Sequence, residues 1–170
     1  MLTVLFIARY RRSVKRDRKI LNTGVSLDFA KIFENIITPL TVAEPEHPNN
    51  LVYVNKAYCD LTGYTAEELI GTNPGKLLQK DITTSKREFI RRKLNSHESI
   101  DVLVKNYRKD GTSFWNGLHI HPVMENGKCL YWVGMAKDVS VYVDQVNEGL
   151  EAVIAVVKGF HQMTDDLKSI

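Results

Sequence analysis

Two cysteines in 170 residues are too few for a disulfide framework. Cys59 and Cys129 lie in apolar stretches without CxxC spacing, so we expect two buried thiols in a reducing cytoplasm. No uninterrupted apolar run reaches the ~20 residues that a membrane-spanning helix needs. Five prolines and ten glycines exclude a low-complexity chain. What remains is an ordinary globular chain, long enough for one domain with helical extensions.

A net positive charge is confined to one short segment. Residues 9–19 (RYRRSVKRDRK) carry seven Lys or Arg and one Asp, a net charge of +6, whereas the whole chain carries only +3. The remaining chain is therefore acidic, and nucleic acid is not an expected partner. We interpret residues 1–25 as a basic, helical extension whose residues 9–19 could contact a membrane surface or an acidic partner, with a solvated helix face as the plain alternative.

The first apolar stretch, LTVLFIA at residues 2–8, precedes the basic segment instead of following it. This order is wrong for a signal peptide, although the end of a membrane helix stays open as an alternative.

Enzyme motifs are absent as well. The sequence has no nucleophile elbow, P-loop, HExxH or dinucleotide-binding GxGxxG, so we expect no enzyme activity.

The middle of the chain alternates short strands and short helices. Capping signals and apolar spacing predict helices at 26–36, 56–61, 65–70 and 83–95, and alternation predicts strands at 39–44, 51–55, 100–108, 112–124 and 128–139. Asp110-Gly111 is a strong hairpin signal. The order predicts an α+β domain over residues 26–140, with five strands in one antiparallel sheet and the helices on one face.

Residues 141–170 follow a different pattern. Apolar residues recur at alternating spacings of three and four, which is the seam of a coiled coil: Val143, Val146, Leu150, Val153, Val157, Phe160 and Leu167, with Thr164 as a polar member. We interpret this C-terminal amphipathic helix as a homodimer or bundle contact. A single amphipathic helix that folds back onto the sheet is the alternative.

Three segments together resemble a known family. They are LVYVNKAYCDLTGYTAEELIG at 51–71, NYRKDGTSFWN at 106–116 and YWVGMAKDVS at 131–140. They look like a PAS domain, and more narrowly they are similar to the light-oxygen-voltage (LOV) subgroup, over roughly residues 26–140. The resemblance implies the PAS fold with flanking N- and C-terminal helices, and a sensor that holds a flavin, FMN or FAD, between its helices and its sheet.

The resemblance also implies site residues. Asn106 and Asn116 match two asparagines that hydrogen-bond the pyrimidine edge of the flavin, and an amide side chain suits that edge because it both donates and accepts. Asn73 and Gln79 match polar residues of the flavin-binding loop, and Arg91 matches an arginine that pairs with the flavin phosphate. Counted outward from Asp110-Gly111, Asn106 and Asn116 should lie roughly opposite each other on adjacent strands.

Two departures from the subgroup stand out. Pro74 occupies the place of the cysteine that forms a photo-adduct with the flavin, and the arginine that follows it is missing. Lys76 is a candidate replacement for that charge. On the last strand, Ala136 stands where the subgroup has a glutamine. We therefore expect non-covalent flavin binding without an adduct, and sensing of redox state, oxygen or light.

Two alternatives stay open at this point. A haem sensor would use His97, His119 or His121 as an axial ligand. A cofactor-free PAS domain would serve dimerisation or interaction only. In every case, the output must pass to a downstream protein or domain through the flanking helices.

Overall fold

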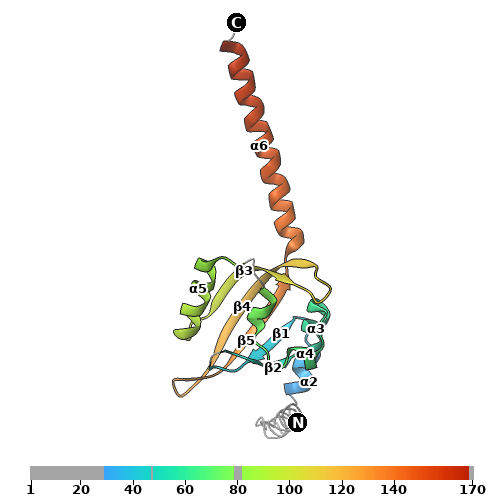
Figure 1. Ribbon diagram of the computed structural model, residues 1–170, viewed down its shortest axis with the longest axis vertical. Coiled ribbons are helices and arrows are strands. Elements are labelled where there is room, and N and C mark those ends of the chain that lie inside the picture. The colour runs from blue at the N-terminus through green and yellow to red at the C-terminus, as the bar shows by residue number, and fades with distance from the viewer. Residues whose placement is uncertain (1–28, 47, 79–81, 169–170) are drawn as a thin grey trace, which may run out of the picture.

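The computed structural model describes residues 29–46, 48–78 and 82–168. Figure 1 shows a sheet domain from which one long helix projects. The antiparallel sheet has the order β2-β1-β5-β4-β3 and consists of β1 (Leu40–Ala43), β2 (Leu51–Val54), β3 (Ile100–Tyr107), β4 (Ser113–Glu125) and β5 (Lys128–Asp138). The described helices are α2 (Phe29–Glu34), α3 (Lys56–Thr62), α4 (Ala66–Leu69), the 3₁₀ helix η1 (Pro74–Leu78), α5 (Thr84–Asn95) and α6 (Ser140–Lys168). The predicted α+β fold with one five-stranded antiparallel sheet is confirmed.

The short helices begin and end where their capping residues predict. Gly63 terminates α3 in the left-handed conformation at φ 75°, where a side chain would be strained. Thr65 opens α4, and its backbone N–H donates to the Glu68 carboxylate at 2.9 Å. At the start of α5, the Thr83 hydroxyl accepts from the Lys86 N–H at 3.3 Å.

The β3–β4 hairpin turn is one residue longer than the Asp110-Gly111 signal alone indicates. The Arg108 N–H donates to the Thr112 carbonyl at 2.8 Å, which leaves Lys109, Asp110 and Gly111 as a three-residue turn. Gly111 has a φ of 86°, as such turns require of their last residue. The extra residue sets the register of all eight paired positions of β3.

One face of the sheet carries the core, and we call it the inner face. Ala43, Leu51, Trp132 and Ala136 of the strands are buried there in one cluster with Tyr58 of α3, Leu69 of α4 and Leu77 of η1. The helices therefore cover this face, with η1 against β3, α4 against β2 and α3 against β1. The opposite, outer face exposes Leu103, Tyr131 and Met135 partially.

Asn55 fixes the N-terminal flank to this domain. It is fully buried, and its Nδ2 donates to the carbonyls of Phe33, Ile36 and Thr38 at 3.2, 3.1 and 2.9 Å. Its Oδ1 accepts from the N–H groups of Leu40 and Tyr58 at 2.9 and 3.0 Å. One amide thus joins α2, β1 and α3.

The flanking segments differ from their predicted lengths. Of the helix expected at 26–36, the described part, α2, ends at Glu34, and its expected cap Ser26 lies outside the described residues, as do residues 1–25. The C-terminal helix starts at Ser140 and runs through 29 residues. Among the described residues, no helix is both long and apolar enough to cross a membrane.

Candidate functional site

Asn106 and Asn116 lie on the inner face of β3 and β4, and both are almost fully buried. Counting outward from the turn predicted that the two amides lie opposite each other, and this prediction is wrong. Asn106 pairs with Phe114, and Asn116 pairs with Val104, so the two amides are diagonal neighbours. The three-residue turn is the cause. With a two-residue turn Asn106 would be opposite Trp115, and the two amides would point to opposite faces.

The two amides differ in their hydrogen bonding. The Oδ1 of Asn116 accepts from the Lys137 backbone N–H at 3.2 Å, whereas the buried Oδ1 of Asn106 has no partner among the described residues. A buried acceptor without a partner costs about 1–3 kcal/mol, so proteins rarely keep one without a purpose. A ligand with an N–H group at this place would satisfy Asn106.

The loop from Gly71 to η1 is shaped by Asn73. Its Oδ1 accepts from the Gly75 N–H at 2.6 Å, and its Nδ2 donates to the Pro48 carbonyl. Asn73 therefore holds the turn that begins η1, whatever else it contacts. Lys76 is exposed on η1, and Gln79 lies outside the described residues.

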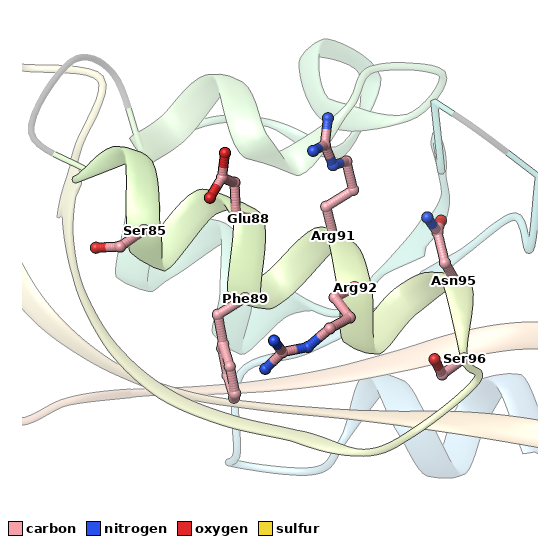
Figure 2. A pocket seen from close by; sticks show the side chains of 7 residues that line it. All are labelled: Ser85, Glu88, Phe89, Arg91, Arg92, Asn95 and Ser96. Atoms are coloured by element: carbon pink, nitrogen blue, oxygen red, sulfur yellow. The ribbon is translucent and has the colours of Figure 1, made fainter.

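Arg91 is exposed on α5 and lines a shallow hollow along that helix, together with Ser85, Glu88, Phe89, Arg92, Asn95 and Ser96. Figure 2 shows Arg91 and Glu88 pointing to one side of α5 and Phe89 and Arg92 to the other. The Arg92 guanidinium lies over the Phe89 ring at 5.8 Å. Of the two arginines, Arg92 is therefore stacked on Phe89 and Arg91 is not.

Neither cysteine is an activated thiol. Cys59 is half-buried on α3 and packs against the core, and burial, with smaller contributions from nearby acidic groups, raises its pKa. Cys129 is buried in the core itself, and burial likewise raises its pKa. Thiols with raised pKa values stay protonated at neutral pH and are poor nucleophiles.

Two of the three candidate haem ligands are not on the inner face. His119 and His121 alternate with the inward residues of β4 and therefore lie on the outer face. His119 hydrogen-bonds Asp101 at 2.5 Å, and His121 hydrogen-bonds Ser99 at 2.7 Å. His97 is exposed near the Trp132 ring, at 6.1 Å between centroids. Within the described ranges, no three His, Cys, Asp or Glu side chains gather as a metal site.

Sequence reasoning missed two groups at this site. Trp132 is buried on the inner face, and its indole N–H is the other buried polar group without a partner in the described chain. The Lys137 N–H is a backbone group, which no sequence pattern reveals. Trp132 could have been found from the sequence. It lies an even number of residues before Ala136, so the two side chains share one face of the strand and should border the same space.

Comparisons with known proteins agree with this fold. Residues 39–141 match the family model described as PAS domain. The chain is 42% identical to a blue-light photoreceptor of Listeria innocua over 100 residues, which are 58% of this chain and 40% of that protein. It is 35% identical to a blue-light-activated histidine kinase of Brucella anthropi over 141 residues, 79% of this chain and 28% of that protein.

Two solved structures are similar as well. An RNA-binding light-oxygen-voltage receptor has a TM-score of 0.68 and 31% identity, over 73% of this chain and 36% of that one. A light-oxygen-voltage domain studied with a flavin analogue has a TM-score of 0.63 and 27% identity, over 74% of this chain and 96% of that one. The chain spans less than half the length of the curated relatives it matches. It belongs to the PAS domain family, with LOV photoreceptors among its relatives.

Proposed function

We propose that residues 26–140 form a sensor that binds a flavin nucleotide without a covalent bond and signals through its flanking helices. The observation that carries this proposal is the pair of buried amides on the inner face, of which Asn106 has an acceptor without a partner. The relatives named for blue light support the same class of sensor.

The donors and acceptors of the two amides suit a flavin. The pyrimidine edge of the isoalloxazine ring presents an N–H between two carbonyl oxygens. The free Oδ1 of Asn106 suits that N–H, and the Nδ2 of Asn116 suits a carbonyl, since its Oδ1 is engaged by Lys137. A bound flavin would supply absorption of blue light and a reversible redox centre.

The remaining contacts are assigned by the resemblance. Arg91 and Lys76 are the exposed cations proposed for the phosphate, and Asn73 and Gln79 are proposed for the loop contacts. Arg91 suits a phosphate because a guanidinium offers paired donors. The proposal covers both FMN and FAD, because the loop arginine of the subgroup is missing.

The proposed sensor does not form a cysteinyl adduct. Pro74 begins η1 at the position of the reactive cysteine, and neither Cys59 nor Cys129 is an activated thiol. The signal is then a change in the redox state of the flavin: a reductant, with or without light, supplies the electrons, and oxygen takes them up on reoxidation. Reduction adds a proton at N5 and electron density to the ring, so the carbonyl oxygens at the edge that Asn106 and Asn116 face become stronger hydrogen-bond acceptors.

The output is proposed to pass through α6. This helix exposes apolar seam residues, with Val146 at 70% and Leu150 at 57% exposure, and an exposed apolar stripe favours association with a second helix. We propose a homodimer that acts on a downstream domain or protein in the cytoplasm. The proposed membrane contact of residues 9–19 lies outside the described residues.

A cofactor-free interaction module is the second candidate. One observation favours it: Trp132, Ala136, Leu77 and Leu69 already form one packed cluster on the inner face. Haem has no comparable support, because His119 and His121 lie on the outer face with partners of their own.

Absorption spectroscopy of the purified protein tests the proposal. We expect flavin bands in the protein as isolated or after incubation with FMN or FAD, and quenched flavin fluorescence on binding. Asn106→Leu should weaken binding about tenfold, the equivalent of one lost hydrogen bond. His119→Ala, on the outer face of the same sheet, is the control and should leave affinity unchanged. Protein that stays colourless with both nucleotides would favour the cofactor-free module.

A further inference from the structure

Two consecutive residues of β4 bind the end of β5 and the start of α6. The Val139 N–H donates to the Trp115 carbonyl at 2.8 Å, and the Trp115 N–H donates to the Ser140 hydroxyl at 2.9 Å. The next residue of β4 is Asn116, whose side chain accepts from the Lys137 N–H. Three hydrogen bonds therefore connect residues 115 and 116 to the chain that becomes α6.

The orientation of the Asn116 amide follows from chemistry. A backbone N–H can only donate, so the Asn116 atom bonded to Lys137 must be the carbonyl oxygen. The NH₂ end then points away from that bond. Asn116 is 1% exposed, which means that this donor lies inside the domain and not in solvent.

We propose that Asn116 is the positioning residue that couples the bound flavin to α6, through the Lys137 N–H. This inference rests on the proposed function and deepens it. One end of the amide meets the flavin edge, and the other holds the backbone two residues before Val139. A change at the flavin edge that rotates or withdraws the amide changes the Lys137 hydrogen bond and the start of α6.

Ala136 explains why the coupling runs through β4. Its methyl group is buried on the inner face beside Asn116, and a methyl group forms no hydrogen bond. The inner-face residue of β5 that follows, Asp138, is turned to Arg108 and Ser140 at 2.6 and 2.7 Å. Near this end of β5, the described side chain that joins the inner face to the β5 backbone is therefore Asn116.

Asn106 is a matched control. It is the same residue type, on the same face, equally buried and also proposed to meet the flavin edge. Its Oδ1 has no partner in the part of the chain that the structure describes, and its strand, β3, is separated from β5 by β4. Loss of Asn106 should therefore weaken flavin binding without changing the response of α6.

The test measures amide hydrogen exchange by NMR in ¹⁵N-labelled full-length chain, with and without saturating FMN. In the wild-type protein, we expect FMN to change the Lys137 amide shift and to change exchange in the first turn of α6 by about fivefold, the size of one hydrogen bond. Asn116→Ala should abolish the FMN-dependent difference at saturation. Asn106→Ala should retain it, at a higher FMN concentration.

Each result decides between the claims. FMN binding to wild-type protein with no change at Lys137 or in α6 overturns the coupling and leaves the proposed function standing. A FMN-dependent difference that survives Asn116→Ala also overturns the coupling. If neither FMN nor FAD binds, both claims fail. Should Asn116→Ala not fold, the wild-type and Asn106→Ala measurements still decide, because equal loss in Asn106→Ala contradicts a role specific to Asn116.

Discussion

Apolar side chains are buried in the sheet domain and exposed along α6. Leu51 and Ile100 of the domain are 0% exposed, whereas Val146 and Val153 of α6 are 70% and 59% exposed. The domain thus completes its own core, and α6 presents an apolar seam that still needs a surface. The difference separates two parts of one chain, and it underlies the proposal that the domain holds a ligand and the helix binds a partner.

The largest effect should come from breaking the domain at Asn55. Asn55→Ala removes hydrogen bonds to five backbone groups, and we expect the free energy of unfolding to fall by about 3–5 kcal/mol. Urea denaturation measures the loss. Asn35→Ala is the control, because its exposed amide bonds only the Lys31 carbonyl, and it should cost less than about 0.5 kcal/mol. Equal losses in both variants would contradict the role of Asn55.

The next effect tests the seam of α6. Val146→Asp with Val153→Asp should weaken dimerisation more than about 100-fold, because a dimer would bury the new charges. Thermal unfolding of the domain should change little, since both side chains are exposed. Sedimentation gives the mass in solution.

Gln145→Asp with Ala152→Asp adds the same charge beside the seam and should leave the dimer intact. A dimer that survives the seam variant would place the interface elsewhere in the chain.

A smaller effect sharpens the comparison inside the domain. Asn106→Leu removes a buried acceptor without a partner, so the ligand-free protein should become more stable by about 1 kcal/mol. The variant would gain stability while losing flavin affinity. Calorimetry of ligand-free protein measures the first effect, and destabilisation by more than about 1 kcal/mol would show that the wild-type acceptor is satisfied after all.

These positions also show what the sequence could and could not predict. The boundaries of α3, α4 and α5, the caps at Gly63, Thr65 and Thr83, and the five strands follow from local patterns, since capping and alternation act over a few residues. The pairing of Asn106 with Phe114 did not follow, because it depends on one extra residue in the turn. Asn55 looked like the end of a strand, although four of its five partners lie 15 to 22 residues earlier in the chain.

The same limit applies to the candidate site. Family motifs identified Asn106 and Asn116, and both are buried on one face of the sheet. Their unequal bonding was not predictable, because the Lys137 N–H reaches Asn116 only through the pairing of β4 with β5. Arg91, Lys76, Asn73 and Gln79 remain predictions.

The smallest expected effect is a pH dependence where the domain meets α6. Burial tends to raise the pKa of Asp138, but hydrogen bonds from Ser140 and Arg108 outweigh it and hold this pKa below its ordinary value of 3.8. Because the pKa is lower in the folded state, the ionised carboxylate stabilises that state at pH values above the ordinary pKa. This stabilisation is lost as pH falls through the pKa of the folded state.

The protection of backbone amides against hydrogen exchange at the start of α6 should therefore be constant from about pH 7 to pH 5. It should decline below about pH 4. We expect a change of less than about 1 kcal/mol, because the Arg108–Asp138 pair is partly exposed. Asp138→Asn should flatten this dependence. An unchanged profile in that variant would assign the decline to other carboxyl groups.

The 29 residues of α6 also have a mechanical consequence. At 1.5 Å per residue the helix extends roughly 40 Å, and Figure 1 shows it projecting away from the sheet beyond its first turn. A rigid rod of that length is a lever with its fulcrum at Ser140. A tilt of about 5° there, set by a few short bonds, displaces the far end by roughly 4 Å, which approaches one helical turn. A small change in the hydrogen bonds near Ser140 would therefore move a downstream domain, attached at the far end, by about the length of a side chain.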